Sequence, residues 1–457
     1  MNEQKQLPTA IEYYVKNPIH FDVSAEIGEQ PASTPEFHFG RQPIGLKDIA
    51  KGRKIGVSGA GDVHKKFSAW ALDHQGFERH VTTRTNPIQQ NGLDYAATLE
   101  TMPKDIDFLL IQSPPAGHPD AIRWAQEHDL PAMVEKPFVS THDELVQKGG
   151  IDESLKNLRA PVYCMDWEVA LATPLFAALG VPAPFKDIVK FENHNAFAQF
   201  DKGNITRIET TFLEGGDNPL GDMDYVRKNR PWLFDITKGG GALYDMGVHA
   251  MNTLAVLGFM PGEVKSAVLG EAKNGMGKGH YAKIGKENLP PEKQTGEFYA
   301  RAEMDSHYNG KNIPTLVECG KGGAANDMRI TLTDKDGRVL NWEYGPDKSI
   351  VTLKDKNGAV LATAHSEIDP YALMFDEAAR FFEREKIEKK LNKDYAPAAL
   401  YYPEHKAVLH ALDKMQEIGR AHPVQEGEVV KQLLLEQQVD LGKATVTAPA
   451  KTTHKAA

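Results

Sequence analysis

The chain has 457 residues and a formal net charge of −10 at pH 7, with 41% hydrophobic and 25% charged residues. This composition is typical of a globular protein and excludes a fibre or a wholly disordered chain. The acidic balance argues against nucleic acid or an anionic membrane as partner, because both attract clustered Lys and Arg. The length predicts about two or three domains.

The two cysteines, Cys164 and Cys319, lie far apart and have no metal-ligand spacing. We therefore expect no disulfide framework and no Cys-built zinc site, and we assign no metal ligands. The N-terminus has no apolar signal core, and no run reaches the about 20 apolar residues of a spanning helix. These features predict a cytoplasmic protein without a membrane partner.

In chain order, residues 1–50 are rich in Pro and Gly without a sustained period, which predicts an extended N-terminal arm. An apolar strand at residues 54–58 then enters the turn Gly59-Ala60-Gly61. Further strands are predicted at 80–84, 107–112 and 132–135, with a helix over 119–128. Alternating strands and helices indicate a Rossmann domain over residues 51–165, with a doubly wound parallel sheet.

After residue 165 the pattern changes to alternating runs with one apolar face, and the turns Asp336-Gly337 and Asn357-Gly358 favour hairpins. Two amphipathic helices are predicted over residues 370–384 and 403–418. Residues 166–422 are thus predicted to form an α/β domain for substrate binding and oligomerisation, with a large, mostly antiparallel open sheet. Residues 423–457 are predicted to form a C-terminal segment and disordered tail. The predicted strands are 187–197, 205–213, 263–269, 297–306, 314–319, 328–333, 339–344 and 350–353.

The glycine turn carries a dinucleotide fingerprint with one departure. Gly59 and Gly61, followed by Asp62 and Val63, are predicted to hold the cofactor, whereas His64 stands at the third glycine position. Glycine there normally allows a helix to pack closely on the strand. An ordinary tight turn is the alternative, but the place at the first strand of an alternating sheet favours the cofactor.

The end of the second predicted strand should contact the adenine ribose. It holds Arg84 and Thr85 and no carboxylate, and NAD enzymes usually bond the ribose hydroxyls through a carboxylate. Arg84 and Thr85 suit a 2′-phosphate, so the sequence favours NADP over NAD. Alternatively, Arg84 stacks on adenine without selecting between the two.

The next strand ends supply further candidate cofactor contacts, since ligands of doubly wound sheets bind at the carboxyl edge. These residues are Ser113, Pro114, His118, Glu135 and Lys136. Lys136 is also a candidate catalytic residue, because a positive charge there favours a developing alkoxide.

The richest segment is the run Gly239-Gly240-Gly241 followed by Asp245 and His249. The glycines permit close backbone approach to a ligand. Asp245 and His249 share one face of a helix, so the carboxylate is expected to orient the imidazole, or both to meet the substrate. A surface contact is the alternative, but the apolar neighbours argue against free exposure.

Together, the glycine turn, Ser113-Pro114-Pro115 with His118, Glu135-Lys136-Pro137 and the later Gly-Gly-Gly-x-x-x-Asp-x-Gly-x-His run resemble the Gfo/Idh/MocA oxidoreductase family. The resemblance spans about residues 54 to 420. It implies a nicotinamide cofactor, and a catalytic set of Lys136, Asp245 and His249 that acts on a sugar or polyol. His64, Arg84, the N-terminal arm and Asp166-Trp167 depart from the family pattern.

The leading prediction is an NAD(P)-dependent dehydrogenase of a secondary alcohol in a sugar, sugar derivative or cyclitol. His249 would take the hydroxyl proton and Lys136 would stabilise the oxyanion. One alternative is a glycosidase or epimerase that retains its nicotinamide and uses transient oxidation. Another is a non-catalytic binding protein on the same fold. The open sheet and the family resemblance predict a homo-oligomer, a dimer or tetramer.

Overall fold

The computed structural model describes residues 7–16, 28–29, 41–42, 52–59, 76–82, 94–96, 98–147, 149–182, 188–215, 230–271, 296–323, 326–344, 349–367 and 369–421, with residues 61, 64, 68 and 72. The predicted C-terminal tail lies outside the described residues. Among the described helices, none combines the length and apolar character needed to cross a bilayer.

One sheet has seven strands in the order β18-β8-β7-β6-β3-β4-β5, and every adjacent pair is parallel. Its centre is apolar: Val57 of β3 pairs with Leu110 of β6, and both are buried. This confirms the predicted parallel sheet. The strands are β3 (Lys54–Ser58), β4 (Glu78–Thr82), β5 (Asp94–Ala96), β6 (Phe108–Ile111), β7 (Ala132–Val134), β8 (Val162–Cys164) and β18 (Ala399–Leu400).

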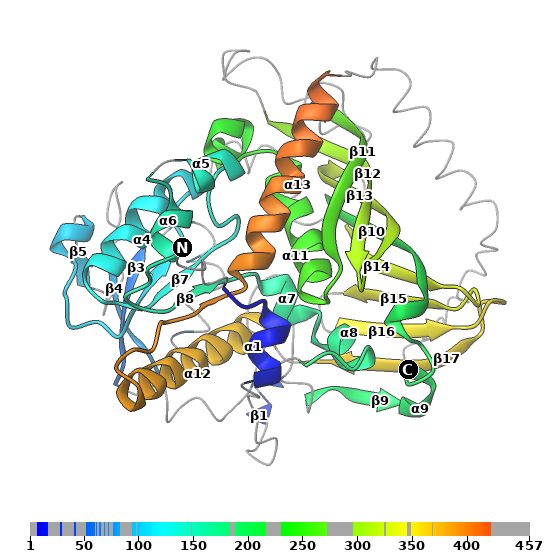
Figure 1. Cartoon of the computed structure of the whole chain (residues 1–457), viewed down its shortest axis with the longest axis horizontal. Helices are drawn as coiled ribbons and strands as arrows, with labels where there is room; N and C mark the ends of the chain where they lie inside the picture. Colours follow the sequence, from blue (N-terminus) through cyan, green and yellow to red (C-terminus); the bar gives the residue numbers. More distant parts are fainter. Residues whose placement is uncertain are drawn as a thin grey trace, which may run out of the picture.

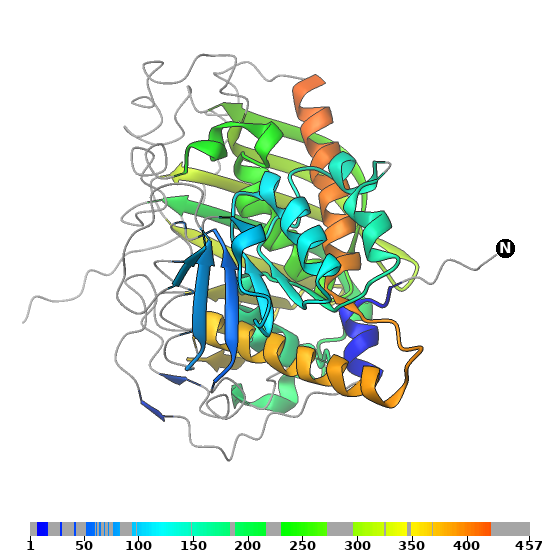
Figure 2. The same ribbon diagram turned by 90° about the vertical axis from the view of Figure 1, so that its left-hand side faces the viewer.

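Short helices follow these strands, and a late helix returns to the same sheet. Helix α12 packs beside β6, with the rings of Phe108 and Phe382 5.3 Å apart, and lies next to the blue strands in Figure 2. Strand β18 then pairs with β8, a return of the chain that the sequence analysis did not anticipate. The helices here are α4 (His118–Glu127), α5 (His142–Val146), α6 (Ile151–Leu155), α7 (Trp167–Leu171), α8 (Thr173–Ala178) and α12 (Pro370–Leu391).

A nine-stranded sheet follows in the order β11-β12-β13-β10-β14-β15-β16-β17-β9. Only β10 and β13 pair in parallel among these strands, which confirms the mostly antiparallel prediction. Helices α11 (Val248–Val256) and α13 (Tyr402–Ala421) lie between the two sheets in Figure 1. The strands are β9 (Lys190–Glu192), β10 (Ile205–Gly215), β11 (Met260–Glu271), β12 (Glu297–Tyr308), β13 (Lys311–Gly323), β14 (Asp327–Asp334), β15 (Val339–Tyr344), β16 (Ser349–Lys354) and β17 (Val360–Ser366).

Both predicted tight turns are hairpins. Gly337 and Gly358 have φ values of 77° and 86° where β14 turns into β15 and β16 into β17. The strand predicted over 187–197 is wrong in its second half, where α9 (His194–Phe197) forms. Asn193 adopts a left-handed conformation with φ of 58° and donates a 2.7 Å hydrogen bond to the Leu361 carbonyl, which ends β9.

The predicted extended arm is also corrected, because it contains helix α1 (Ala10–Lys16). Tyr13 and Tyr14 are buried, and the Ala10 N–H donates to Glu404 Oε1 at 2.6 Å. The Tyr13 hydroxyl donates to Glu385 Oε1 at 3.2 Å. This packing explains why a short helix forms in a segment without a sustained period.

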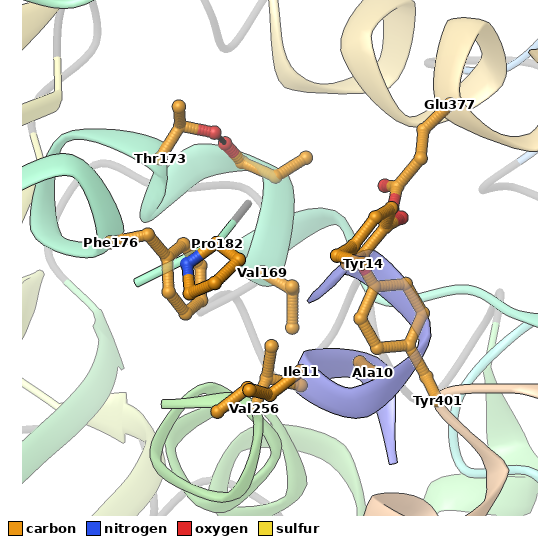
Figure 3. Close-up of a pocket in the computed structure, with 11 residues that line it drawn as sticks. Ala10, Ile11, Tyr14, Val169, Thr173, Phe176, Pro182, Val256, Glu377 and Tyr401 are labelled. Carbon is orange, nitrogen blue, oxygen red and sulfur yellow. Dashed lines mark hydrogen bonds between the residues drawn. The ribbon is translucent and has the colours of Figure 1, made fainter. Parts of the chain in front are cut away.

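Helix α1 borders a mainly apolar pocket against α7, α8 and α11, drawn in Figure 3. Its lining residues are Ala10, Ile11, Tyr14, Val169, Ala170, Thr173, Phe176, Pro182, Val256, Glu377 and Tyr401. None of them belongs to the predicted catalytic or cofactor set. The remaining short elements are β1 (Gly28–Glu29), which pairs with β2 (Arg41–Gln42), and the helical turns η2 (Leu99–Thr101), η3 (Pro115–Gly117), η5 (Lys202–Asn204), η7 (Pro231–Phe234), η8 (Ile236–Lys238) and η9 (Leu243–Gly247).

Candidate active site

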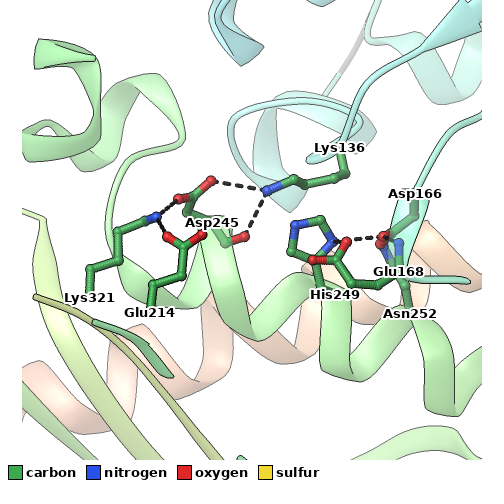
Figure 4. A network of polar contacts seen from close by, with 8 residues as sticks. All are labelled: Lys136, Asp166, Glu168, Glu214, Asp245, His249, Asn252 and Lys321. Atoms are coloured by element: carbon green, nitrogen blue, oxygen red, sulfur yellow. Dashed lines mark hydrogen bonds and ion pairs between the residues drawn. The ribbon is translucent and has the colours of Figure 1, made fainter. Parts of the chain in front are cut away.

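The carboxyl edge of the parallel sheet brings Lys136 to the segment that holds Asp245. Lys136 follows β7, and its peptide bond to Pro137 is cis. Its Nζ donates to the Asp245 carbonyl oxygen at 2.7 Å and to Asp245 Oδ1 at 3.0 Å, as Figure 4 shows. Two of the three predicted catalytic residues therefore form a buried ion pair between the two sheets.

Asp245 lies in the π-helical turn η9, and a second buried lysine occupies its other oxygen. Lys321 Nζ is 2.6 Å from Asp245 Oδ2 and also pairs with Glu214. Burial alone would raise the pKa of the Asp245 carboxyl, but Lys136, Lys321 and Arg230 hold that pKa well below its usual value. Asp245 is therefore an anion fixed between two cations.

His249, one turn further along, has different partners. Its Nδ1 lies 2.6 Å from Asp166 Oδ1 and also contacts Glu168 Oε2, while Asn252 Nδ2 donates to Asp166 Oδ2 at 2.8 Å (Figure 4). The expectation that Asp245 orients the imidazole is therefore wrong. The physical reason is that both carboxylate oxygens of Asp245 are taken by lysines, whereas Asp166 projects from the strand end beside α11.

The protonation of this cluster follows from burial and charge. Burial lowers the pKa of His249, and Lys136 lowers it further, against the opposing effect of Asp166. Burial would raise the pKa of Asp166, but His249 and its hydrogen bonds lower it overall. A neutral His249 that donates its Nδ1 hydrogen to Asp166 keeps the Nε2 lone pair free.

Two further buried groups lie close enough to affect these charges. Burial raises the pKa of Glu135 to about 8. Burial lowers the pKa of His405 on α13 to about 4, and neither of its ring nitrogens has a hydrogen-bond partner among the described residues. His405 is therefore a neutral neighbour of Asp166 and His249 near pH 7.

The triple glycine has a structural explanation that the sequence analysis did not give. Gly241 has φ of 98°, and a Cβ there would lie 2.5 Å from Glu297 Oε1. That carboxylate accepts a 2.9 Å hydrogen bond from the Leu243 N–H at the start of η9. At Gly240, a Cβ would lie 2.5 Å from the Trp232 carbonyl oxygen. The close approach at these two glycines is to protein atoms, and it sets the position of Asp245.

The first strand ends in a turn that fits a dinucleotide phosphate. Gly59 has φ of 94°, and a Cβ there would lie 2.5 Å from the Ser113 backbone nitrogen. At Gly61 a Cβ would meet no atom of the described residues within 4 Å. Ser113 is half-buried and Pro114 is exposed at the neighbouring strand end. A glycine at positive φ that packs against the next strand end suits the close backbone approach that a pyrophosphate requires.

His64, the residue at the third glycine position, is buried in a polar network. Its Nδ1 lies 3.0 Å from Gln112 Oε1, and its Nε2 lies 3.0 Å from Arg79 Nη1. Gln112 follows β6 and Arg79 lies in β4, so the imidazole joins the strands on both sides of β3. This network accommodates a large side chain where the fingerprint has glycine.

His118 holds two loops together and is completely buried. Its Nε2 lies 2.6 Å from the Ser113 carbonyl oxygen, and its Nδ1 lies 3.1 Å from that of Pro137. Burial lowers the pKa of His118 to about 4, so the ring is neutral and donates one hydrogen. It connects the turn after β6 to the turn that carries Lys136, and its side chain does not face an open site.

Four predicted cofactor contacts, Asp62, Val63, Arg84 and Thr85, lie outside the described residues. The partners Asp166, Glu168, Glu214 and Lys321 are site residues that were not predicted from the sequence. The sequence held a signal for Asp166 and another for Glu214 and Lys321. Asp166 follows a buried parallel strand at its carboxyl edge. Glu214 and Lys321 occupy the inward phase of β10 and β13, like Phe212 and Cys319 two residues earlier.

No family model matches the sequence, and no curated protein matches it. Solved structures share its fold. An inositol dehydrogenase homolog from Azotobacter vinelandii, complexed with NAD⁺, is 15% identical, with a TM-score of 0.58 over 83% of this chain and 98% of that chain. The chain has the fold of the Gfo/Idh/MocA family.

Two further structures have the same fold. A 3-ketoreductase from Actinomadura kijaniata, in complex with NADP and TDP-benzene, is 13% identical, with a TM-score of 0.53 over 80% of this chain and 97% of that chain. An aldose-aldose oxidoreductase from Caulobacter crescentus, complexed with glycerol, is 12% identical, with a TM-score of 0.52 over 81% and 98%. The fold predicted from the motifs is therefore confirmed.

Proposed function

We propose that this protein is a nicotinamide-dependent oxidoreductase that acts on a secondary alcohol of a sugar, sugar derivative or cyclitol. The observation that carries the proposal is the convergence of a lysine and an imidazole at the carboxyl edge of the parallel sheet. Lys136 and His249 both lie in the cluster that joins the two sheets, and Lys136 acts electrostatically on His249. The structures that share the fold include a 3-ketoreductase solved with NADP, an inositol dehydrogenase homolog solved with NAD⁺ and an aldose-aldose oxidoreductase, which supports this class.

The cofactor would be held by Gly59, Gly61, Ser113 and Pro114, where the turn and strand ends fit it, and by Glu135 and Lys136. Of the residues outside the described ranges, Asp62, Val63, Arg84 and Thr85 would complete the contacts. A bound nicotinamide supplies the hydride acceptor. The protein's own contribution is to orient the alcohol and to manage its proton and negative charge.

In this proposal His249 Nε2 accepts the hydroxyl proton while Nδ1 keeps its hydrogen bond to Asp166. The Lys136 ammonium stabilises the developing oxyanion, and Asp245 holds that ammonium in place through two hydrogen bonds. Asp245 also remains deprotonated, because the Lys321 ammonium compensates its negative charge from the other side. Asp245 therefore acts on Lys136 more directly than on His249.

The experiment is an oxidation screen of the full chain with sugars, sugar acids and inositols, each with NAD⁺ and with NADP⁺, by the absorbance of the reduced nicotinamide. We expect turnover with members of one of these classes, lost in Lys136→Ala. A Glu377→Gln variant is the matched control, since Glu377 is buried and its carboxylate accepts hydrogen bonds from the tyrosines Tyr163 and Tyr401, outside the catalytic cluster. Absence of turnover with every compound and both cofactors would contradict the proposal.

A further inference from the structure

The Nδ1 atom of His249 has two carboxyl neighbours. Asp166 Oδ1 lies 2.6 Å away, and Glu168 Oε2 contacts the same nitrogen. The side chains of Asp166 and Glu168 are each 1% exposed and that of His249 is 3% exposed. A neutral imidazole has one N–H, so it can donate to one of these carboxyl groups. A negative charge on the second carboxyl group would need another source of compensation.

The two carboxyl groups have unequal surroundings. Asp166 caps helix α7, accepting the Glu168 N–H at 3.2 Å, and it also accepts from Asn252 Nδ2 and faces His249. Neither carboxyl oxygen of Glu168 accepts a hydrogen bond from a described residue. A buried anion without donors is costly, whereas three donors stabilise one. The negative charge therefore belongs on Asp166.

We propose that Glu168 is a protonated carboxylic acid that donates its hydrogen to Asp166, so that the pair carries one negative charge beside His249. The inference rests on the proposed function, in which His249 accepts the substrate proton. Glu168 is then a positioning residue. Two negative charges would keep a proton on the imidazole, and a neutral pair would not stabilise the imidazolium. A single charge keeps His249 a base that can be protonated during turnover.

Other groups around the pair agree with this charge assignment. Lys136 lowers the pKa of His249, whereas Asp245 raises it. His405 and Glu135 both interact electrostatically with Asp166. The ring of Trp167 packs edge-on at 5.9 Å from the His249 ring. Burial raises the pKa of Glu168 well above its usual value, and Asp166 raises it further. Lys136 opposes this increase.

The test is a histidine NMR titration of the full chain, in which the His249 signal is identified by its loss in His249→Gln. Replacing an anion beside His249 by an amide must lower the histidine pKa. We expect Asp166→Asn to lower it by more than about one unit and Glu168→Gln to change it by less than about half a unit. The Glu377→Gln control should leave it unchanged. An equal decrease in Glu168→Gln and Asp166→Asn would overturn the proposal.

This titration needs no substrate, so failure of the proposed function and failure of this inference are distinguishable. With a substrate in hand, Asp166→Asn should lower kcat by about 10²-fold or more, and Glu168→Gln should lower it by less than Asp166→Asn does. If Glu168→Gln unfolds, Glu168→Met supplies a second uncharged variant of similar size, with the same expectation for the titration.

Elemental analysis of the purified protein completes the test. Asp166, Glu168 and His249 bring potential ligand atoms within 4.8 Å of one another, so a divalent cation is the competing source of positive charge. We expect no stoichiometric metal. One equivalent of metal per chain that disappears in Glu168→Gln would overturn the shared proton.

Discussion

His249 Nδ1 and Asp166 Oδ1 lie 2.6 Å apart although 83 residues separate them in the chain. Asp245, only four residues before His249, instead bonds Lys136 and Lys321. The orientation of the imidazole therefore depends on the end of β8 in the parallel sheet. This contact links the proposed proton acceptor to the same sheet edge that carries Lys136.

The pH dependence of oxidation should report the charges around His249. Because the pKa of His249 lies below its usual value, the base form persists to lower pH, and activity should fall only below the pH at which an ordinary histidine titrates. Lys136 lowers this pKa and Asp166 raises it, so Asp166→Asn should move the acid limb of kcat/KM to lower pH. In Lys136→Met, the acid limb of the residual kcat/KM should move to higher pH. Shifts of the opposite sign would contradict these charges.

Lys321→Met should destabilise the fold strongly. Lys321 is 1% exposed, and its loss leaves Glu214 without this cation and Asp245 with one lysine fewer. Breaking a buried pair costs about 3 to 5 kcal/mol. The exposed Lys190–Glu367 pair is the control, and Lys190→Met should cost less than about 1 kcal/mol. Chemical denaturation measures both, and equal values would contradict the role of Lys321.

Cofactor preference tests the interpretation of Arg84, which lies outside the described residues. We expect NADP to bind more tightly than NAD. Arg84→Ala should remove this advantage, because a charge-assisted phosphate contact contributes about 1.5 to 3 kcal/mol. Calorimetric titration with both cofactors measures it. Tighter binding of NAD by the parental protein, or an unchanged preference in the variant, would contradict the prediction.

The nine-stranded sheet predicts self-association. Thr331, Asn341, Thr352 and Thr363 form a partly exposed row across four adjacent strands. We expect this face to pair with another subunit, in a dimer or tetramer with an interface above about 1,000 Å². Analytical ultracentrifugation should give a multiple of the chain mass across dilution. A mass near one chain throughout would contradict the prediction.

Local patterns predicted much of the fold. The alternation of apolar and polar residues over 339–344 predicted β15 with its observed bounds. The Asp-Gly and Asn-Gly turns predicted the positions of two hairpins. The short helix α1 was missed, because packing of Tyr13 and Tyr14 against distant residues stabilises it. Strand β18 has only two residues, too few for a periodic pattern.

The candidate site was predictable only in part. Lys136, Asp245 and His249 carry a motif, and the structure brings them into one cluster. Their partners depend on long-range contacts. The spacing of Asp245 and His249 suggested a mutual contact, but it could not show that Lys321 of β13 would reach Asp245. Nor could it show that Asp166 would face His249.

The most direct test of the proposed oxidation follows the hydrogen itself. A substrate found in the screen is deuterated at its secondary-alcohol carbons and incubated with the oxidised cofactor, and the reduced nicotinamide is examined by mass spectrometry. We predict that deuterium accumulates in the reduced nicotinamide, and that His249→Ala slows this transfer by about 10²- to 10⁴-fold while cofactor affinity is nearly unchanged. A nicotinamide that gains no deuterium while the substrate is converted, or a folded His249→Ala variant that transfers it at the parental rate, would contradict the account.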